Sequence, residues 1–305
     1  MTNTPASPGH GSPESVTLNN GVEMPSLGLG VFQSPPEETA AAVETALRGG
    51  YRLVDTAVAY ANEKEVGQGL RRSGVDRGEV FLTTKLWLTD YGYDSALRSF
   101  DTSLNELGVD YLDLWLLHYP VPVAQDIVDA SYKAAEKLVA EGRVRAIGVS
   151  NYTPRLLRRL VDIAEVLPAV NQVELHPYFM QNELRALHEQ LGILTQAWSP
   201  LGAVTQYEPD SPNSGRRVLD EPVITEIAAK HGKTPAQTVL RWHLEHGTCV
   251  IPKSVKAHRI AENLDVFDFS LTPEQVEAID ALDTGHRSGP DPEATRLDSF
   301  SQHNP

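Results

Sequence analysis

Four side chains in the sequence could together protonate a carbonyl oxygen, namely those of Tyr60, Lys85, Asp55 and His118. A phenol with a pKa near 10 is a poor acid at neutral pH, and we expect the ammonium of Lys85 to lower the pKa of Tyr60 by roughly two to three units. Asp55 is the carboxylate available to keep Lys85 charged at a partly buried position. A neutral imidazole at His118 can donate a hydrogen bond to the polarised carbonyl.

These four side chains supply a proton but no electrons. None of them can deliver hydride to a carbonyl carbon, so the set implies an external redox cofactor. The chemistry expected from the residues is the reduction of an aldehyde or ketone, with hydride from the cofactor and a proton from Tyr60.

The fold must bring these residues together, and the pattern of short apolar runs indicates how. Most of the runs are separated by about ten to twenty residues in which apolar side chains have helical spacing. The runs cover residues 27–31, 52–55, 80–85, 112–117, 144–149, 169–173, 193–198 and 248–251. A strand alternating with a helix eight times in 305 residues predicts a parallel (β/α)8 TIM barrel. A doubly wound parallel sheet is the alternative fold.

The apolar runs end at residues that could form a site. The residues at seven of these ends are Asp55, Lys85, His118, Ser150 with Asn151, Gln172, Trp198 with Ser199, and Lys253 with Ser254. A single Asp or Ser after a strand is often only a helix N-cap, but seven positions in register are improbable by chance. Because the carboxyl ends of barrel strands converge on one face, we predict that the site lies there.

Three local segments have recognisable patterns. Residues 16–24 predict a β-hairpin, because the Asn20-Gly21 pair supplies the positive φ angles of a tight turn. Ser34 is predicted to cap a helix that starts with two prolines and runs to Gly49. Residues 202–220 have turn residues and no periodicity, which predicts a long loop on the rim after the seventh strand.

The two ends of the chain differ from its middle. Residues 1–15 and 285–305 are rich in Pro, Gly and Ser and are predicted to be flexible tails. Residues 16–284 are predicted to form a single barrel domain.

Composition and charge exclude several classes of function. The 26 Lys and Arg against 41 Asp and Glu give a net charge of −15, opposite to the basic surface of nucleic-acid binders. Cys249 is the only cysteine, so neither an intrachain disulfide nor a multi-cysteine metal site is possible. The sequence has neither a signal peptide nor an apolar run of about 18 residues. We therefore expect a cytoplasmic protein that binds no nucleic acid, membrane or metal.

Several motifs resemble one enzyme family, the aldo-keto reductases. They are GYRLVDTAVAYANE (residues 50–63), the strand end at Lys85, LLHYP (116–120), GVSNY, NQVELHP, WSPLG and IPKSV. Residues 231–244 and 263–272 are most similar to bacterial 2,5-diketo-D-gluconate reductases. The resemblance implies a (β/α)8 barrel with a hairpin closing its bottom, and a monomer.

The resemblance also implies roles for individual residues. Tyr60 would be the general acid, Lys85 and Asp55 its tuning pair, and His118 the group that orients the carbonyl. Residues at the carboxyl strand ends would bind the cofactor. Ser150, Asn151 and Gln172 would hold the nicotinamide carboxamide, Trp198 would stack on the ring, and Ser199, Leu201 and Gly202 would follow it. The adenosine end would be bound by Lys253, Ser254, Val255, Arg259, Glu262 and Asn263.

The charge at the adenosine end indicates which cofactor binds. Lys253, Lys256 and Arg259 place positive charge near a helix start in an acidic chain, which suits a 2′-phosphate and therefore NADPH rather than NADH. The substrate would lie against Phe32, Trp87, His118 and Tyr119.

Two alternatives compete with an NADPH-dependent carbonyl reductase acting on keto sugar acids or other small carbonyl compounds. The first is a redox-sensing module that binds NADPH on the same barrel without turnover. The second is a short-chain dehydrogenase, suggested by the spacing of Tyr60 and Lys64. That family would place the cofactor phosphates near Gly28 and Gly30, where the third glycine of its motif is missing.

Overall fold

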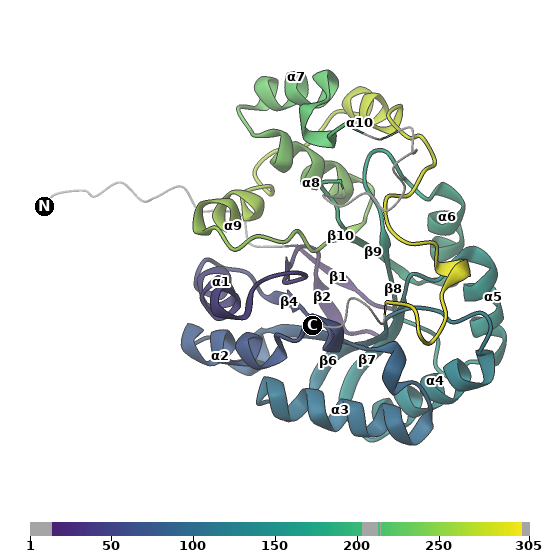
Figure 1. The fold of residues 1–305 in the computed structure, drawn as a ribbon. Helices are drawn as coiled ribbons and strands as arrows, with labels where there is room; N and C mark the ends of the chain where they lie inside the picture. The colour runs from purple at the N-terminus through teal and green to yellow at the C-terminus, as the bar shows by residue number, and fades with distance from the viewer. Residues whose placement is uncertain (1–13, 203–212, 214, 301–305) are drawn as a thin grey trace, which may run out of the picture.

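The structure is a closed barrel of eight parallel strands surrounded by helices (Figure 1). It is a computed structural model that describes residues 14–202, 213 and 215–300. In chain order, which is also the spatial order, the strands are β3 (Leu29–Gly30), β4 (Leu53–Asp55), β5 (Phe81–Leu86), β6 (Leu112–Leu117), β7 (Val144–Ser150), β8 (Val170–Glu174), β9 (Leu194–Trp198) and β10 (Cys249–Val250).

Hydrogen bonds between the first and last strands close the barrel. The Gly28 N–H donates to the Val250 carbonyl at 2.9 Å, and the Gly30 N–H donates to the Pro252 carbonyl at 3.2 Å. A doubly wound sheet would leave these two edges apart. The predicted (β/α)8 barrel is therefore confirmed.

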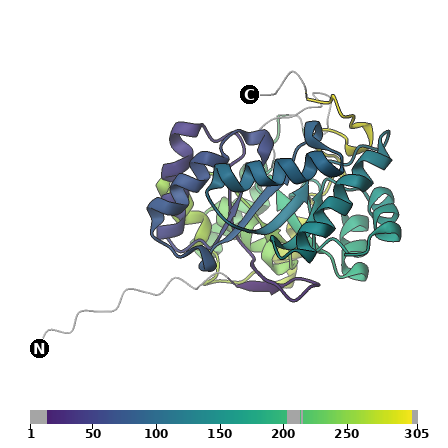
Figure 2. The same ribbon diagram turned by 90° about the horizontal axis from the view of Figure 1, so that it is seen from below.

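The helices lie on the outside of the barrel (Figures 1 and 2). They are α1 (Pro36–Arg48), α2 (Glu63–Ser73), α3 (Tyr93–Leu107), α4 (Gln125–Ala140), α5 (Pro154–Ile163), α6 (Asn182–Leu191), α7 (Pro222–His231), α8 (Pro235–Glu245), α9 (Ala257–Leu264) and α10 (Pro273–Asp280). None of the helices within the described ranges is both long and apolar enough to cross a membrane.

The start of α1 differs in one detail from the prediction. Pro35 is the N-cap, with a ψ of 140°, and Ser34 makes no cap hydrogen bond to the helix. The Ser34 hydroxyl instead accepts a bond from the Thr39 hydroxyl at 2.9 Å. The predicted Ser34 cap is wrong, because the extended proline already begins the helix and leaves the serine one position too early.

The predicted hairpin closes one end of the barrel. Strands β1 (Ser15–Thr17) and β2 (Glu23–Pro25) pair antiparallel, with Val16 opposite Met24. Met24 is buried against the residues that fill the barrel interior. Figure 2 shows the hairpin at the end opposite the carboxy-terminal segment. Strand β1 begins within the predicted amino-terminal tail, and residues 1–13 lie outside the described residues.

Apolar side chains fill the barrel interior and the space under the helices. The interior cluster includes Leu53, Phe81, Leu114, Val170 and Cys249. Cys249 is fully buried on β10, and burial raises the pKa of its thiol to about 12. The larger cluster joins the outer strand faces to the helices.

Two predicted irregular segments have different outcomes. The long loop at 202–220 lies mostly outside the described residues, and its end forms a short 3-10 helix, η4 (Val218–Asp220). Residues 285–300 are not the predicted flexible tail, because they pack across the barrel mouth with Ser288, Pro292 and Thr295 buried. The Pro, Gly and Ser residues that suggested a linker here form tight turns and η5 (Pro292–Ala294).

Candidate active site

A buried ion pair lies at the carboxyl ends of β4 and β5. Lys85 Nζ donates to Asp55 Oδ1 at 2.5 Å and to the Thr56 carbonyl at 2.9 Å. Gln172 Nε2 from β8 donates to the other oxygen, Asp55 Oδ2, at 2.7 Å. Both charged side chains are almost completely buried. The carboxylate therefore joins three strands and holds the ammonium in place.

Tyr60 reaches this ion pair from the loop after β4. It ends the 3-10 turn η1 (Val58–Tyr60), and its hydroxyl lies 3.3 Å from Lys85 Nζ. Ala61 follows in the left-handed region with a φ of 49°. Asn62 holds this loop, since its amide donates to the Val31 carbonyl at 3.0 Å and its oxygen accepts from the Thr56 hydroxyl at 2.8 Å.

Sequence reasoning missed Asn62. An Asn before a helix suggests an N-cap, and Asn62 does occupy that position before α2, but it makes no side-chain cap bond. The signal that could have found it is its place two residues after Tyr60.

His118 lies beside Tyr60 at the end of β6. The ring centroids are 5.7 Å apart in an edge-on arrangement. Burial, and then the charge of Lys85, lower the pKa of His118 well below its ordinary value. Its buried Nδ1 has no hydrogen-bond partner among the described residues. The imidazole is therefore neutral, so that one of its ring nitrogens can donate a hydrogen bond.

The pKa of Tyr60 differs from the prediction. Burial, followed by the negative charge of Asp55, raises it well above the ordinary value. Burial also lowers the pKa of Lys85, although Asp55 opposes that change. The predicted lowering of the Tyr60 pKa is wrong because Lys85 lies closer to Asp55 than to the phenol, and its charge is largely balanced there. Tyr60 therefore remains protonated at neutral pH.

The residues predicted to hold the nicotinamide carboxamide form one network at the ends of β7, β8 and β9. Ser150 Oγ donates to the Gln172 carbonyl at 2.7 Å. Asn151, with a φ of 65°, donates through Nδ2 to the His118 carbonyl at 2.9 Å. Trp198 Nε1 donates to Asn151 Oδ1 at 2.9 Å. The network places these side chains beside His118.

Gln196 completes the network from below and was missed by sequence reasoning. Its Oε1 accepts from Gln172 Nε2 at 2.7 Å. It lies two residues before Trp198 on β9, so the alternation of a strand could have placed it on the same face.

Residues Ser199, Leu201 and Gly202 carry the chain away from this network. Ser199 has a φ of 49° and Gly202 has a φ of 91°. Leu201 is half-buried against the outer apolar cluster. Beyond Gly202 the chain enters residues 203–212, which are outside the described part.

The predicted adenosine site combines exposed cations with a helix start. Lys253, Lys256 and Arg259 are exposed where α9 begins, and Lys256 caps this helix without a side-chain bond. Ser254 is buried, and its hydroxyl accepts from the Lys256 N–H at 3.1 Å. Cations beside the N–H groups of a first helical turn fit a phosphate group.

The other predicted adenosine-site residues lie along the same segment. Val255 is half-buried and Asn263 is buried. Glu262 accepts a hydrogen bond from the Thr234 hydroxyl at 2.8 Å.

The two glycines of the short-chain dehydrogenase alternative do not form a phosphate cradle. A Cβ on Gly28 would lie 1.8 Å from the Leu53 side chain, and one on Gly30 would lie 2.6 Å from the Ile251 carbonyl oxygen. Both glycines therefore pack against neighbouring strands. Lys64 is exposed on α2. The alternative is wrong in its fold, because the sheet closes into a barrel.

Aromatic rings surround Tyr60 and His118. Phe32, which is 51% exposed, lies 5.1 Å from Tyr60 between ring centroids, and Trp87 lies 5.0 Å from His118. Tyr119 stacks on His118 at 5.6 Å. The residues predicted to form the walls of the substrate site therefore lie together around Tyr60 and His118.

Phe300 adds a further aromatic ring, although it belongs to the segment predicted to be a flexible tail. Its centroid lies 5.7 Å from that of Trp87 and 5.3 Å from that of Tyr119.

Glu174, at the end of β8, was also missed. Its carboxylate accepts bonds from the Ser288 N–H at 2.6 Å, the Gly289 N–H at 2.9 Å and His176 Nε2 at 3.1 Å. Burial raises its pKa, but these bonds more than offset that effect and lower it overall. Glu174 follows Gln172 by two residues, so strand alternation could have indicated it.

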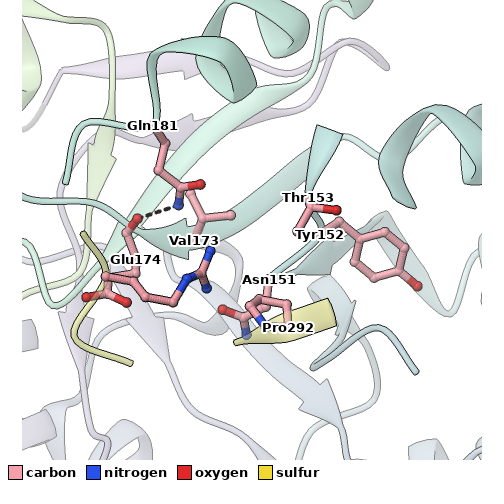
Figure 3. Close-up of a pocket in the computed structure, with 8 residues that line it drawn as sticks. Asn151, Tyr152, Thr153, Val173, Glu174, Gln181 and Pro292 are labelled. Carbon is pink, nitrogen blue, oxygen red and sulfur yellow. Dashed lines mark hydrogen bonds between the residues drawn. The ribbon is translucent and has the colours of Figure 1, made fainter. Parts of the chain in front are cut away.

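Figure 3 shows a small hollow beside Glu174, under the carboxy-terminal segment. Its volume of about 10 Å³ is enough for one water molecule. A larger hollow of about 600 Å³ lies on the outer wall, lined by residues of α6 and by His246 and Asp280. Neither hollow contains Tyr60, Lys85 or His118.

Comparisons with known proteins agree on one family. The sequence model of the aldo/keto reductase family matches residues 26–284. The chain is 52% identical to a morphine 6-dehydrogenase of Pseudomonas putida, over 94% of this chain and 97% of that one. It is 46% identical to a glyoxal reductase of Bacillus subtilis (strain 168), over 92% and 96% of the two chains. The crystal structure of a Gox0644 mutant in complex with NADPH is similar with a TM-score of 0.85 and 45% identity, over 94% of this chain and all of that chain.

Proposed function

The chain belongs to the aldo/keto reductase family, and from this premise we propose that it is an NADPH-dependent oxidoreductase that reduces aldehydes and ketones to alcohols. The observation that carries the proposal is the contact of the Tyr60 hydroxyl with Lys85 Nζ at 3.3 Å, beside a neutral His118. These groups can bind a carbonyl oxygen and give it a proton.

Tyr60 is the proton donor in this proposal. As the carbonyl carbon is reduced, the π electrons move to its oxygen, which takes the proton of the Tyr60 hydroxyl. A raised pKa does not prevent this transfer, because the alkoxide formed is about as basic as hydroxide and is therefore a much stronger base than a phenolate. The phenolate left on Tyr60 is stabilised by Lys85 and is reprotonated from solvent.

His118 orients the carbonyl. A neutral imidazole donates one hydrogen bond to the carbonyl oxygen but does not give up that proton at neutral pH. It therefore polarises the carbonyl without competing with Tyr60 as the acid. Trp87 and Tyr119 exclude water from one side of the ring.

NADPH is the cofactor we propose, and when bound it supplies the hydride. The cations Lys253, Lys256 and Arg259 fit its 2′-phosphate, and the network of Ser150, Asn151 and Gln172 would hold its carboxamide. Trp198 would contact the nicotinamide ring. The similarity to the NADPH-bound Gox0644 mutant supports this assignment.

The substrate we propose is a carbonyl compound, and the site has room for an apolar group on it. The names of the two relatives refer to molecules of very different size, glyoxal and morphine. Keto sugar acids, α-keto aldehydes and prochiral ketones are the substrates to test first.

Tyr60→Phe tests the proposal. The variant is expected to lose turnover by at least about a hundredfold, because general acid catalysis contributes that much or more. Its dissociation constant for NADPH should stay unchanged in a fluorescence titration. Retention of most of kcat would refute the role of Tyr60. Binding of NADPH without turnover of any carbonyl by the unaltered protein would favour the redox-sensing alternative.

A further inference from the structure

Residues 285–300 cross the mouth of the barrel and are attached to it at two places, at residues 288–289 and at Glu293. The yellow segment in Figure 1 passes β8 and α5. Glu174 on β8 holds Ser288 and Gly289. Glu293 accepts hydrogen bonds from Thr153 and Arg155 at the start of α5. The segment then ends against the aromatic rings beside His118.

The contact with Glu174 is closely fitted. The carboxylate is buried, and each of its oxygens accepts one backbone N–H of the segment. A Cβ on Gly289 would lie 2.6 Å from the Trp198 ring and 2.9 Å from Glu174 Oε2. Only glycine permits this approach. The Glu174 carboxylate and the Trp198 ring therefore fix how closely the backbone at Gly289 approaches the barrel.

The other end of the segment forms part of the predicted substrate wall. Phe300 contacts Trp87 and Tyr119, and these two rings in turn contact His118. Ring contacts hold its side chain there, and the attachments of the segment at residues 288–289 and at Glu293 limit how far its backbone can move.

We propose that Glu174 is a positioning residue for substrate selection: by holding Ser288 and Gly289 at the barrel mouth, it places Phe300 as a wall of the substrate site. The inference rests on the proposed carbonyl reductase activity. Its consequence is a preference for carbonyl compounds with an aryl or extended apolar group, because those groups reach Phe300. A small α-keto aldehyde does not depend on that wall.

Glu174→Ala, Gly289→Ala and Phe300→Ala test the inference. The first removes the acceptors, the second pushes the segment outward by steric contact, and the third removes the wall. Gly289→Ala keeps the test valid if Glu174→Ala fails to fold. Asp113→Asn is the matched control, because Asp113 is also a buried carboxylate that accepts a backbone N–H, from Leu82 at 2.9 Å, but at the other end of the barrel.

Steady-state kinetics with NADPH would be measured for methylglyoxal and for an aryl ketone. We expect each of the three variants to lower kcat/KM for the aryl ketone about five- to tenfold, mainly through KM, since one or two aromatic contacts are lost. The values for methylglyoxal should change by less than about twofold. Glu174→Ala combined with Phe300→Ala should be no worse than the more severe single variant, because both act through one wall. Asp113→Asn should leave the ratio of the two substrates unchanged.

Limited trypsin digestion provides a second readout. Cleavage after Arg287 should be faster in Glu174→Ala than in the unaltered protein and in Asp113→Asn, because Arg287 lies next to the released residues. Equal loss for both substrates, additive effects in the double variant, or unchanged cleavage would overturn the inference while turnover by the unaltered protein still supports the proposed function. Absence of turnover by the unaltered protein with either substrate, and with the wider set of carbonyls, would overturn the proposed function and the substrate selection with it.

Discussion

Replacing Lys85 with Met tests the electrostatic basis of the proposed chemistry. The change removes the only charge that contacts the Tyr60 hydroxyl in the described structure, at 3.3 Å. At an effective dielectric constant of about 20, a unit charge at that distance stabilises a phenolate by at most about 5 kcal/mol, because Asp55 balances part of the Lys85 charge. If about half of the phenolate charge has formed in the transition state, the loss is about 2.5 kcal/mol. We therefore expect kcat to fall by about 70-fold if half of the charge has formed, and by at most about 5,000-fold if all of it has formed.

The same change has a separate effect on stability. Without Lys85, Asp55 remains buried with Gln172 as its remaining side-chain partner among the contacts described. Breaking a buried ion pair by removing one partner costs about 3–5 kcal/mol of unfolding free energy. The double variant Asp55→Asn with Lys85→Met removes both charges, so it should regain most of that stability.

The double variant separates the two effects. Urea unfolding would give the free energy of unfolding, and single-turnover oxidation of NADPH would give the rate of the chemical step. We expect the double variant to be stable and still much slower than the unaltered protein, because the cation near Tyr60 is missing, but faster than Lys85→Met, because the Asp55 charge that disfavours the phenolate is gone as well. Recovery of the full rate of the unaltered protein together with the stability would refute the reasoning, as would a Lys85→Met protein that keeps more than about a tenth of kcat.

Two other predictions concern the cofactor and pH. Arg259→Ala is expected to raise the dissociation constant for NADPH about tenfold and to leave that for NADH nearly unchanged, because a charge-assisted bond to the 2′-phosphate is lost. Fluorescence titration measures both constants, with Lys133→Ala on α4 as an exposed control. Burial lowers the pKa of His188 to about 4 and that of His243 to about 3. Below about pH 6.5 the unfolded chain therefore binds more protons than the native one, and the free energy of unfolding should fall by about 1.4 kcal/mol per pH unit for each histidine until the native pKa is reached. Urea unfolding near pH 7 and near pH 5 measures this fall; a slope equal in His243→Asn and in the unaltered protein would contradict it.

Local pattern was enough to predict where the proposed catalytic residues lie in the fold. Asp55, Lys85 and His118 each come at or near the carboxyl end of a short apolar run, and in a parallel barrel those ends meet. The hairpin before β3 also followed from its Asn20-Gly21 pair, although of these two residues only Gly21 has a positive φ, of 83°. Strand periodicity and turn chemistry act over a few residues, so both can be read directly from the sequence.

The properties that sequence did not reveal depend on distant neighbours. Burial and the nearby charge of Asp55 set the pKa of Tyr60, and the spacing of residues along the sequence determines neither of them. Glu174 and Gly289 are 115 residues apart, and composition alone made the segment around Gly289 resemble a linker. Its glycine is required by close contact with Trp198 and Glu174, not by flexibility.

The position of the single cysteine has a consequence for how long such an enzyme survives its own substrates. Aldehydes and dicarbonyls are electrophiles that attack thiolates. Burial raises the pKa of the Cys249 thiol to about 12, so the side chain is protonated at pH 7, and it lies inside the barrel. The amine of Lys85 is likewise held as an ion pair away from solvent. Neither nucleophile is therefore exposed to adduct formation, and chemical damage by the substrate should fall first on surface lysines and arginines.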